Sequence, residues 1–600
     1  MIGRQQWGAL ILAVFLAPYF LHLGTSALWD ANEAFYVEGP REMLESGDLL
    51  SPRFNFSLKL NKPILPYWVV LPTFALFGVS EWSERVVIAT CMVVTILLTY
   101  ALGRRLYGHG VGLLGAIVLA SSVKFLIVGR RSLIDALLTT LLVAALYLLV
   151  RGATERKFSA GAYIMMGLAV LTKGLVGIVI PLGVVLTFLL WQGMRQAYPR
   201  SSRGSVLSFI LHQSLRGLNV LRFPLGLFII LAVATPWYAA MIHRHGWGFL
   251  SAFIIGDHVK RFLYGTSGMS RPWWYYGPVL MSEFFPWSLF LPAAIAATVL
   301  RLRSSGEASW ATGTPTDTFA SSAICRSLPA NSATGPASGH QGSAPSEWAD
   351  CFLLAWMGFI LIFFSLSVAK QNEYLLPLYP AAALVVGRFF SEARPFSSRL
   401  IKGLFALSIA LLAGGFIGGA WVAASRAPML FDSHRLLTTT SVTLLTAALL
   451  LAGAYLLGTL RQVFALTALT MLVLTGVLLS LLPKLEAYRP VRHLAERITR
   501  EAAPDDLVGY YRFTAPSLCY YTRRKIFEVF TPDEIKEILR STRRAFCLMY
   551  ERDIIALGAD SGWPLRVIEC RPSLFPMTMK RFLRLRGPDD LERICLVTNH

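Results

Sequence analysis

The class of fold is decided by the stretch VVIATCMVVTILLTYALG at 86–103, which is followed closely by VGLLGAIVLASSVKFLIV at 111–128 and LIDALLTTLLVAALYLLV at 133–150. Each run matches the roughly 20 apolar residues that a helix needs to cross a lipid bilayer. Lys124 and Asp135 are the charged residues inside these runs. The sequence therefore predicts closely spaced transmembrane helices.

The composition of the whole chain agrees with a membrane protein. Its 600 residues are 55% hydrophobic and 15% charged, with a mean hydropathy of +0.54. Soluble domains carry about 25% charged residues, so the bilayer is the expected solvent. The formal net charge of +21 is spread in short groups between the apolar runs, without a basic tract. This pattern is typical of the positive-inside rule, and we expect no nucleic-acid partner.

Apolar runs of this length predict thirteen crossings along the chain. The first follows Met1–Arg4 and resembles a signal peptide, but it lacks a small-x-small cleavage site, so we expect a retained helix. The runs lie at 7–27, 86–103, 111–128, 133–150, 159–173, 174–191, 223–242, 274–300, 352–369, 374–390, 403–423, 437–458 and 462–482.

The orientation depends on whether the apolar segment 63–78 crosses the membrane. It is short and contains Pro63, Pro66 and Pro72, which disfavour a long helix. If it does not cross, the Arg-rich loops at 104–105, 151–157, 195–222, 301–303, 388–402 and 461 all fall on one side, which is then the cytoplasm. We therefore expect 63–78 to lie on the outer face of the membrane and the carboxyl tail to lie outside.

These patterns divide the chain into two domains. Residues 1–483 form the transmembrane domain, with an outer loop at 28–85. Its segment 304–349 is rich in Ser, Ala, Thr, Gly and Pro and is typical of a cytoplasmic low-complexity linker. Residues 484–600 have the character of a small soluble α/β domain outside the membrane.

In the carboxyl-terminal domain we expect strands at 508–512, 545–549 and 565–568, and a helix at 532–541 capped by Thr531. The domain holds four of the seven cysteines. One or two disulfides and reduced, buried thiols are both open interpretations. The four are Cys519, Cys547, Cys570 and Cys595.

Charged and aromatic residues gather just after the first helix, in the loop WDANEAFY at 29–36 and in Arg41, Lys62 and the Tyr67–Trp68 pair. The segment 33–46 alternates apolar and charged residues, which suits a helix in the membrane interface with its apolar side in lipid. An ordinary juxtamembrane helix with salt bridges is an equal alternative for this segment alone.

Four further outer loops also carry cations, which favours an anion-binding site on this face. No GxxxxGK[ST] or GxGxxG loop indicates a nucleotide, so a lipid-linked phosphate fits better. Lys173 could equally be a lysine that extends from a helix end to the interface, and for His243 and His258 interfacial hydrogen bonding is favoured over metal binding. The residues of these loops include Arg131, Asp135, Lys173, His243, His258, Lys260, Arg261, Lys370 and Tyr374.

Several of these stretches together resemble the polyprenyl-phosphate-sugar-dependent glycosyltransferases of GT-C fold, which include aminoarabinose transferases and protein O-mannosyltransferases. The resemblance covers about the first 390 residues. It implies a GT-C-like polytopic helical membrane protein with an outer carboxyl-terminal domain. The stretches are NEAFYVEGPREMLESGD at 32–48, PRFN at 52–55, NKP at 61–63, PYW at 66–68, LTKGLVG at 171–177, PWY at 236–238, DHVKRF at 257–262, PWWYY at 272–276 and FSLSVAKQNEYLLPLYP at 364–380.

The resemblance also implies site residues. The catalytic aspartate of the family falls on Asn32, and an amide cannot act as a base, so the role passes to Asp30 or Glu33. Lys62, Arg131 and Lys370 are the expected ligands of the donor phosphate. The expected substrate-binding residues are Tyr36, Arg41, Asp135, Lys173, His258 and Tyr374.

The implied reaction transfers a sugar from polyprenyl (undecaprenyl) phosphate to a lipid such as lipid A, a glycan or a protein. It takes place at the outer face of a bacterial inner membrane. We expect no required cofactor and no metal ligands, with a divalent metal left open. A flippase or transporter for a lipid-linked sugar is the competing class, although transporters place polar residues near the bilayer midplane. A polysaccharide polymerase or ligase is a second alternative.

Overall fold

The computed structural model describes residues 4–30, 32–131, 134–197, 215, 217, 219, 221–265, 269–312, 347–392, 398–561, 565–574 and 578–599. Within these ranges, nine helices are long and apolar enough to cross a membrane. The chain is thus a multi-pass helical protein, as predicted. The nine are α5 (Glu81–Tyr107), α8 (Ile134–Glu155), α10 (Val176–Ala197), α12 (Phe223–His245), α18 (Glu347–Leu366), η5 with α19 (Asn372–Leu378, Tyr379–Ser391), α20 (Arg399–Ser425), α21 (His434–Leu456) and α22 (Leu460–Leu485).

The other four expected crossings coincide with shorter or interrupted helices. The first is α1 (Arg4–Leu16), which ends in a 3-10 turn containing Pro18, earlier than the expected residue 27. The expected crossing at 274–300 is interrupted. Pro286 lies between α15 (Tyr276–Glu283) and α16 (Leu291–Thr312). The remaining two are α6 (His109–Ala120) and α9 (Ala160–Lys173), so the count of thirteen crossings stays a prediction.

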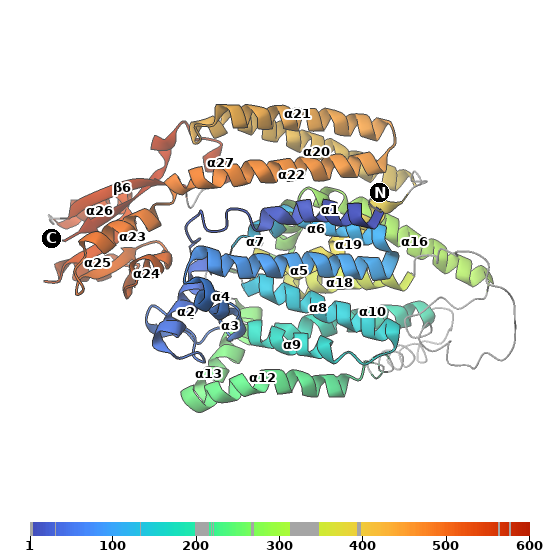
Figure 1. The fold of residues 1–600 in the computed structure, drawn as a ribbon, viewed down its shortest axis with the longest axis horizontal. Coiled ribbons are helices and arrows are strands. Elements are labelled where there is room, and N and C mark those ends of the chain that lie inside the picture. Colours follow the sequence, from blue (N-terminus) through green and yellow to red (C-terminus); the bar gives the residue numbers. More distant parts are fainter. Residues whose placement is uncertain are drawn as a thin grey trace.

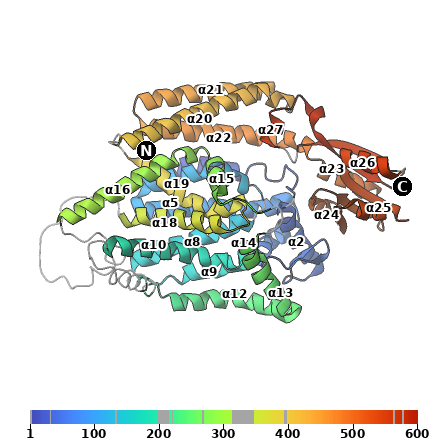
Figure 2. The same ribbon diagram turned by 180° about the vertical axis from the view of Figure 1, so that it is seen from behind.

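The loop after the first helix folds at one end of the helix bundle. It contains α2 (Asn32–Ser46), then a short hairpin whose strands β1 (Arg53–Phe54) and β2 (Ser57–Leu58) have two residues each, and then α3 (Leu65–Trp68) and α4 (Leu71–Phe77). Figure 1 and Figure 2 show α2, α13 (Trp247–Ser251) and the carboxyl-terminal sheet at this same end. With four and seven residues, α3 and α4 are too short to cross a bilayer, in agreement with the expectation for 63–78.

The expectation that the apolar side of α2 lies in lipid is wrong. Most of its apolar and charged side chains are buried, including Val37, Glu38 and Arg41, and Glu45 near its end is exposed. Val37 packs on Val70 of the α3–α4 segment and on Tyr520 of the carboxyl-terminal domain. The helix is buried because the carboxyl-terminal domain covers it, which the local sequence pattern does not reveal.

The carboxyl-terminal domain is a five-stranded sheet in the order β4-β3-β5-β7-β6, with helices on both faces. Its central strands are parallel, and β7 is antiparallel to both of its neighbours. The expected helix is present with a complete capping box at Thr531. The elements are α23 (Pro490–Glu501), β3 (Leu507–Tyr511), α24 (Ser517–Thr522), β4 (Ile526–Val529), α25 (Pro532–Arg540), β5 (Ala545–Tyr550), α26 (Glu551–Ser561), β6 (Arg566–Ser573), α27 (Met579–Phe582) and β7 (Glu592–Thr598).

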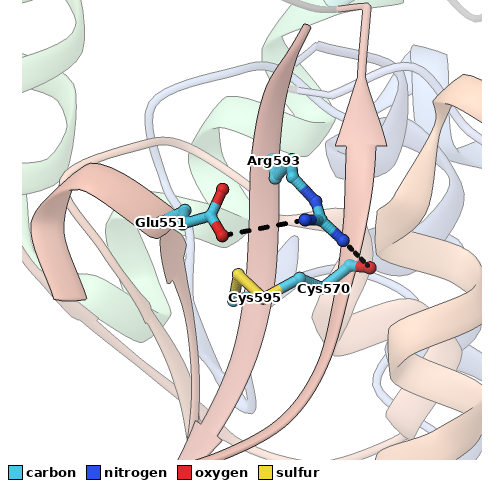
Figure 3. The surroundings of a disulfide bond; sticks show 4 residues. All are labelled: Glu551, Cys570, Arg593 and Cys595. Carbon is cyan, nitrogen blue, oxygen red and sulfur yellow. Dashed lines mark hydrogen bonds and ion pairs between the residues drawn. A yellow bond between two sulfur atoms is a disulfide. The ribbon is translucent and has the colours of Figure 1, made fainter. Parts of the chain in front are cut away.

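A disulfide joins Cys570 of the edge strand β6 to Cys595 of its antiparallel neighbour β7. Figure 3 shows this bond beside Arg593, whose guanidinium lies 3.8 Å from the Glu551 carboxylate and donates to the carbonyl of Cys570. Cys519 and Cys547 are buried thiols. The disulfide interpretation therefore holds for Cys570 and Cys595, and the interpretation as reduced, buried thiols holds for Cys519 and Cys547.

Candidate functional site

An apolar groove runs between α10, α18 and the segment that follows α13. Its volume is about 360 Å³. Its walls are side chains that suit a hydrocarbon chain, among them Val179, Ile180, Phe253 and Phe363.

The apolar groove adjoins a second cavity of about 180 Å³, which we call the polar chamber, and the two share polar lining residues. The chamber opens beneath α2 and is lined by Asn32, Tyr36 and Glu373, among others. A lipid with a charged head group would fit this arrangement, with its chain in the groove and its head at the junction. The residues that line both cavities are Lys62, Asp135, Lys173, Arg261 and Tyr374.

Ion pairs organise the junction of the two cavities. Lys173, at the last position of α9, forms an ion pair with Asp135 at the start of α8, and its ammonium nitrogen lies 4.7 Å from the ring centre of Tyr374. Arg261 donates through Nη2 to the sulfur of Met269, 3.1 Å away. Its buried Nε has no hydrogen-bond partner among the described residues.

A second lysine, Lys124, forms an ion pair with Glu373, a carboxylate that lines the polar chamber. Lys124 lies 3.1 Å from Glu373 and 2.9 Å from Glu283. Asn372 donates to the same Glu283 at 2.8 Å, and this contact fixes the 3-10 turn that carries Glu373. The carboxylate of Glu373 is thereby held in place at the wall of the chamber.

Lys59 also lines the polar chamber, although it is not among the expected site residues. Its ammonium nitrogen lies 3.0 Å from the ring centre of Phe35 and 4.6 Å from that of Phe54. Burial against these rings lowers the pKa of Lys59 to about 7. The charge of this side chain therefore changes near neutral pH.

The two expected catalytic carboxylates do not line the groove or the chamber. Glu33 accepts two hydrogen bonds from Arg85, from Nε at 2.8 Å and from Nη2 at 3.0 Å. Asp30 accepts hydrogen bonds from the backbone N–H and the hydroxyl of Ser517, both at 2.8 Å, and so holds the carboxyl-terminal domain. Burial raises the pKa of Asp30 to about 6. Asn32, the position of the family aspartate, does line the chamber.

Three basic residues that were expected to bind the donor or the substrate instead make contacts within the protein and line neither cavity. Arg41 is buried in ion pairs with Glu38 and Glu45 on α2 itself. Lys370 donates to the backbone carbonyls of Ser367 and Arg271, so its ammonium group is bound to the loop. The guanidinium carbon of Arg131 lies 4.5 Å from the centre of the Trp29 ring, and neither cavity is lined by this residue.

The structure thus brings together Tyr36, Lys62, Asp135, Lys173 and Tyr374 of the expected set. His258 belongs to the helical turn Ala252–Lys260, but its side chain lies outside what the structure describes. Arg261, Glu373 and Lys59 lie in the outer loops that the sequence indicated, but none of them was chosen as a site residue. Each is within three residues of a residue that was chosen, and the sequence does not reveal which neighbour faces the cavity.

Two clusters of the described residues have the composition of metal ligands, and both lie away from the polar chamber. One contains Cys570 and Cys595, which form the disulfide, with Glu551. The other is Glu38, Glu42 and Cys519, where the thiol donates to Glu38 at 3.3 Å. The expectation that the reaction needs no cofactor stays a prediction.

Comparison with known proteins gives matches in sequence and in fold. The family described as dolichyl-phosphate-mannose-protein mannosyltransferase matches residues 61–212. These matches and the fold confirm the resemblance that the motifs predicted, to a polyprenyl-phosphate-sugar-dependent glycosyltransferase of GT-C fold.

Two relatives show how far the likeness in sequence extends. An undecaprenyl phosphate-alpha-4-amino-4-deoxy-L-arabinose arabinosyl transferase of Pseudomonas paraeruginosa is 27% identical over 69% of this chain and 65% of its own length. An uncharacterized protein of Aquifex aeolicus is 28% identical over 67% of this chain and 68% of its own. The alignments thus span about two thirds of these relatives.

A solved structure extends the likeness in fold to the whole chain. ArnT from Cupriavidus metallidurans, bound to undecaprenyl phosphate, superimposes with a TM-score of 0.68 and 20% identity, covering 100% of this chain and 99% of that one. The expected fold class, a polytopic membrane protein with a small carboxyl-terminal α/β domain, is therefore confirmed.

Proposed function

We propose that the protein is a membrane glycosyltransferase that moves a sugar from a polyprenyl phosphate to an acceptor. The observation that carries this proposal is that the apolar groove and the polar chamber share a wall that contains three cations. In this proposal the polyprenyl chain lies in the groove, the phosphate meets Lys62, Lys173 and Arg261, and the sugar enters the chamber.

The proposed reaction forms a bond between the acceptor oxygen and the anomeric carbon and breaks the bond from that carbon to the phosphate oxygen. Negative charge grows on the departing phosphate. The three cations stabilise that charge more in the transition state than in the ground state, which lowers the barrier. Arg261 lines both cavities, so its charge lies at the proposed position of the phosphate.

A hydroxyl acceptor also requires a base on the side of the sugar that faces away from the phosphate. Asp135 lines both cavities and is paired with Lys173 beside the proposed phosphate position. Glu373 lines only the polar chamber, so it is placed to take the acceptor proton. Asn32 is placed to orient the sugar or the acceptor by hydrogen bonds.

In the proposal the chamber faces the outside of a bacterial inner membrane. The outer loop, α13 and the carboxyl-terminal domain share one end of the bundle, and the Arg-rich loops are expected at the other. The acceptor, a lipid such as lipid A, a glycan or a protein, would therefore be met outside the cytoplasm.

Turnover of a radiolabelled undecaprenyl-phosphate sugar by membranes that contain the protein tests the proposal. We expect release of undecaprenyl phosphate, and we expect Lys62→Ala and Arg261→Ala each to slow it at least tenfold, since each removes a charged contact. Arg53→Ala, which removes an exposed hydrogen bond within the outer loop, is the matched control. Movement of intact donor across the membrane without turnover would instead favour a flippase.

A further inference from the structure

A third cavity lies between the loop 27–30 and the carboxyl-terminal domain, and we call it the interdomain cavity. Its volume of about 390 Å³ falls within the roughly 300–1,000 Å³ of small-ligand sites. It shares no lining residue with the apolar groove or the polar chamber. The proposed transfer step does not use it.

The walls of the interdomain cavity combine aromatic rings with hydrogen-bonding groups. Phe513 and Tyr550 lie with ring centres 5.2 Å apart and tilted by 48°. Asp30 and Arg492 supply an acceptor and a donor at the same cavity. A sugar ring offers apolar C–H faces and hydroxyls that both donate and accept, so its chemistry matches this mixture.

The cations of the interdomain cavity are already compensated. Arg489 donates to the carbonyl of Ala27 at 2.7 Å and lies 3.5 Å from Glu486. Arg492 lies 3.7 Å from Glu81 and 3.4 Å from Glu496. The cavity therefore lacks the excess positive charge that a phosphate would need, and a neutral ligand fits it better.

The interdomain cavity is close to the polar chamber along the chain. Asp30 lines the former and Asn32 the latter, and two residues of extended chain span at most about 7 Å. Trp29 lines the interdomain cavity, with the guanidinium carbons of Arg131 and Arg489 at 4.5 Å and 4.4 Å from its ring centre. A short saccharide in the cavity thus reaches toward the site of transfer.

We propose that the interdomain cavity binds a neutral sugar residue of the acceptor, close to the group that receives the transferred sugar. This inference rests on the proposed function, and it makes the acceptor a glycan or a glycolipid. The cavity exists only because the carboxyl-terminal domain covers the loop 27–30, so acceptor recognition is the task that the inference assigns to that domain.

Saturation-transfer NMR on the full-length protein in lipid nanodiscs tests binding, with methyl β-D-glucopyranoside as the probe. Thr514 is an exposed residue of the cavity wall, and Thr514→Trp fills the space at little cost in folding. Ile555→Trp, at a 69% exposed residue outside the cavity, is the control. We expect Thr514→Trp to reduce the sugar signal about fivefold and Ile555→Trp to leave it unchanged. Equal signals in both variants, or displacement of the sugar by inorganic phosphate, would overturn the inference.

A kinetic experiment separates this inference from the proposed function. With a glycan acceptor, Thr514→Trp should raise the acceptor KM about tenfold, while kcat and the slow hydrolysis of donor without acceptor stay at wild-type values. An unchanged acceptor KM overturns the inference and leaves the proposed function standing. If the wild type cleaves no donor, the proposed function fails, and the binding experiment still decides whether the cavity holds a sugar.

Discussion

Glu33 and Arg85 form a two-point ion pair closed to solvent, with Nε 2.8 Å from Oε1 and Nη2 3.0 Å from Oε2. Arg85 also donates to the carbonyls of Leu23, Ser26 and Ala27. One guanidinium at the start of α5 thereby fixes the whole stretch that leads from the first helix into α2. The role of this carboxylate is to hold the loop.

Replacement of Glu33 by glutamine should therefore destabilise the protein. The amide leaves the buried charge of Arg85 without its counter-ion, which typically costs about 3 kcal/mol or more. The measurement is the thermal unfolding midpoint of the full-length protein in detergent, with Glu155→Gln in an exposed ion pair as the control that stays at the wild-type midpoint. A Glu33→Gln protein of full stability and no transfer activity would return this residue to a catalytic role.

Asn32 should matter more for transfer than Asp30. Asn32 lines the polar chamber, and Asn32→Ala removes a hydrogen-bonding group from it, which should lower kcat/KM about tenfold or more. Asp30→Asn keeps an oxygen that can accept from Ser517, so transfer should change less than about threefold. The reverse order of the two effects would move the catalytic centre toward Asp30.

The sequence predicted this loop as a site, and the helix register explains why the choice of residues was partly wrong. Because α2 begins at Asn32, residues 32, 35 and 36 share one face of the helix. All three line the polar chamber, whereas Glu33 points toward α5. Glu33 was expected because an amide at position 32 cannot act as a base, and the sequence does not show which face of α2 the cavity occupies.

The hydropathy pattern located the nine long helices of the described residues, because a spanning helix must be long and apolar regardless of its neighbours. The docking of the carboxyl-terminal domain could not be predicted in this way. Asn55 accepts from the backbone N–H of Ile526 at 2.7 Å and donates to its carbonyl at 2.8 Å, across 471 positions. Such a contact depends on the tertiary arrangement and leaves no local pattern.

Lys59 should give donor binding a pH dependence near neutrality. Burial lowers its pKa to about 7, so the ammonium charge in the polar chamber is lost as the pH rises from about 6 to 8. The donor KM should rise over this interval, because one cation no longer attracts the phosphate. Lys59→Arg keeps its charge at every pH tested and should flatten the profile. Parallel profiles for the two proteins would contradict this role.

The same lysine should affect folding with the opposite dependence on pH. The pKa of Lys59 is about 7 in the folded protein and about 10.5 when unfolded. The unfolded chain therefore holds more protons between these values, and stability should rise with pH across this window. Lys59→Met, which does not titrate, should lose this slope in thermal unfolding measured from pH 7 to 10.

The disulfide between Cys570 and Cys595 should stabilise the outer edge of the carboxyl-terminal sheet. It closes a loop with a sequence separation of 25, for which the loss of chain entropy in the unfolded state corresponds to about 3 kcal/mol. Reductant should therefore increase proteolysis of β6 and β7, and a Cys570→Ser, Cys595→Ser variant should be cleaved at that faster rate with or without reductant. An oxidised bond is also what an extracytoplasmic domain would retain. Labelling of both cysteines by a maleimide in cells without reductant would contradict the bond, and with it this argument for the location of the domain.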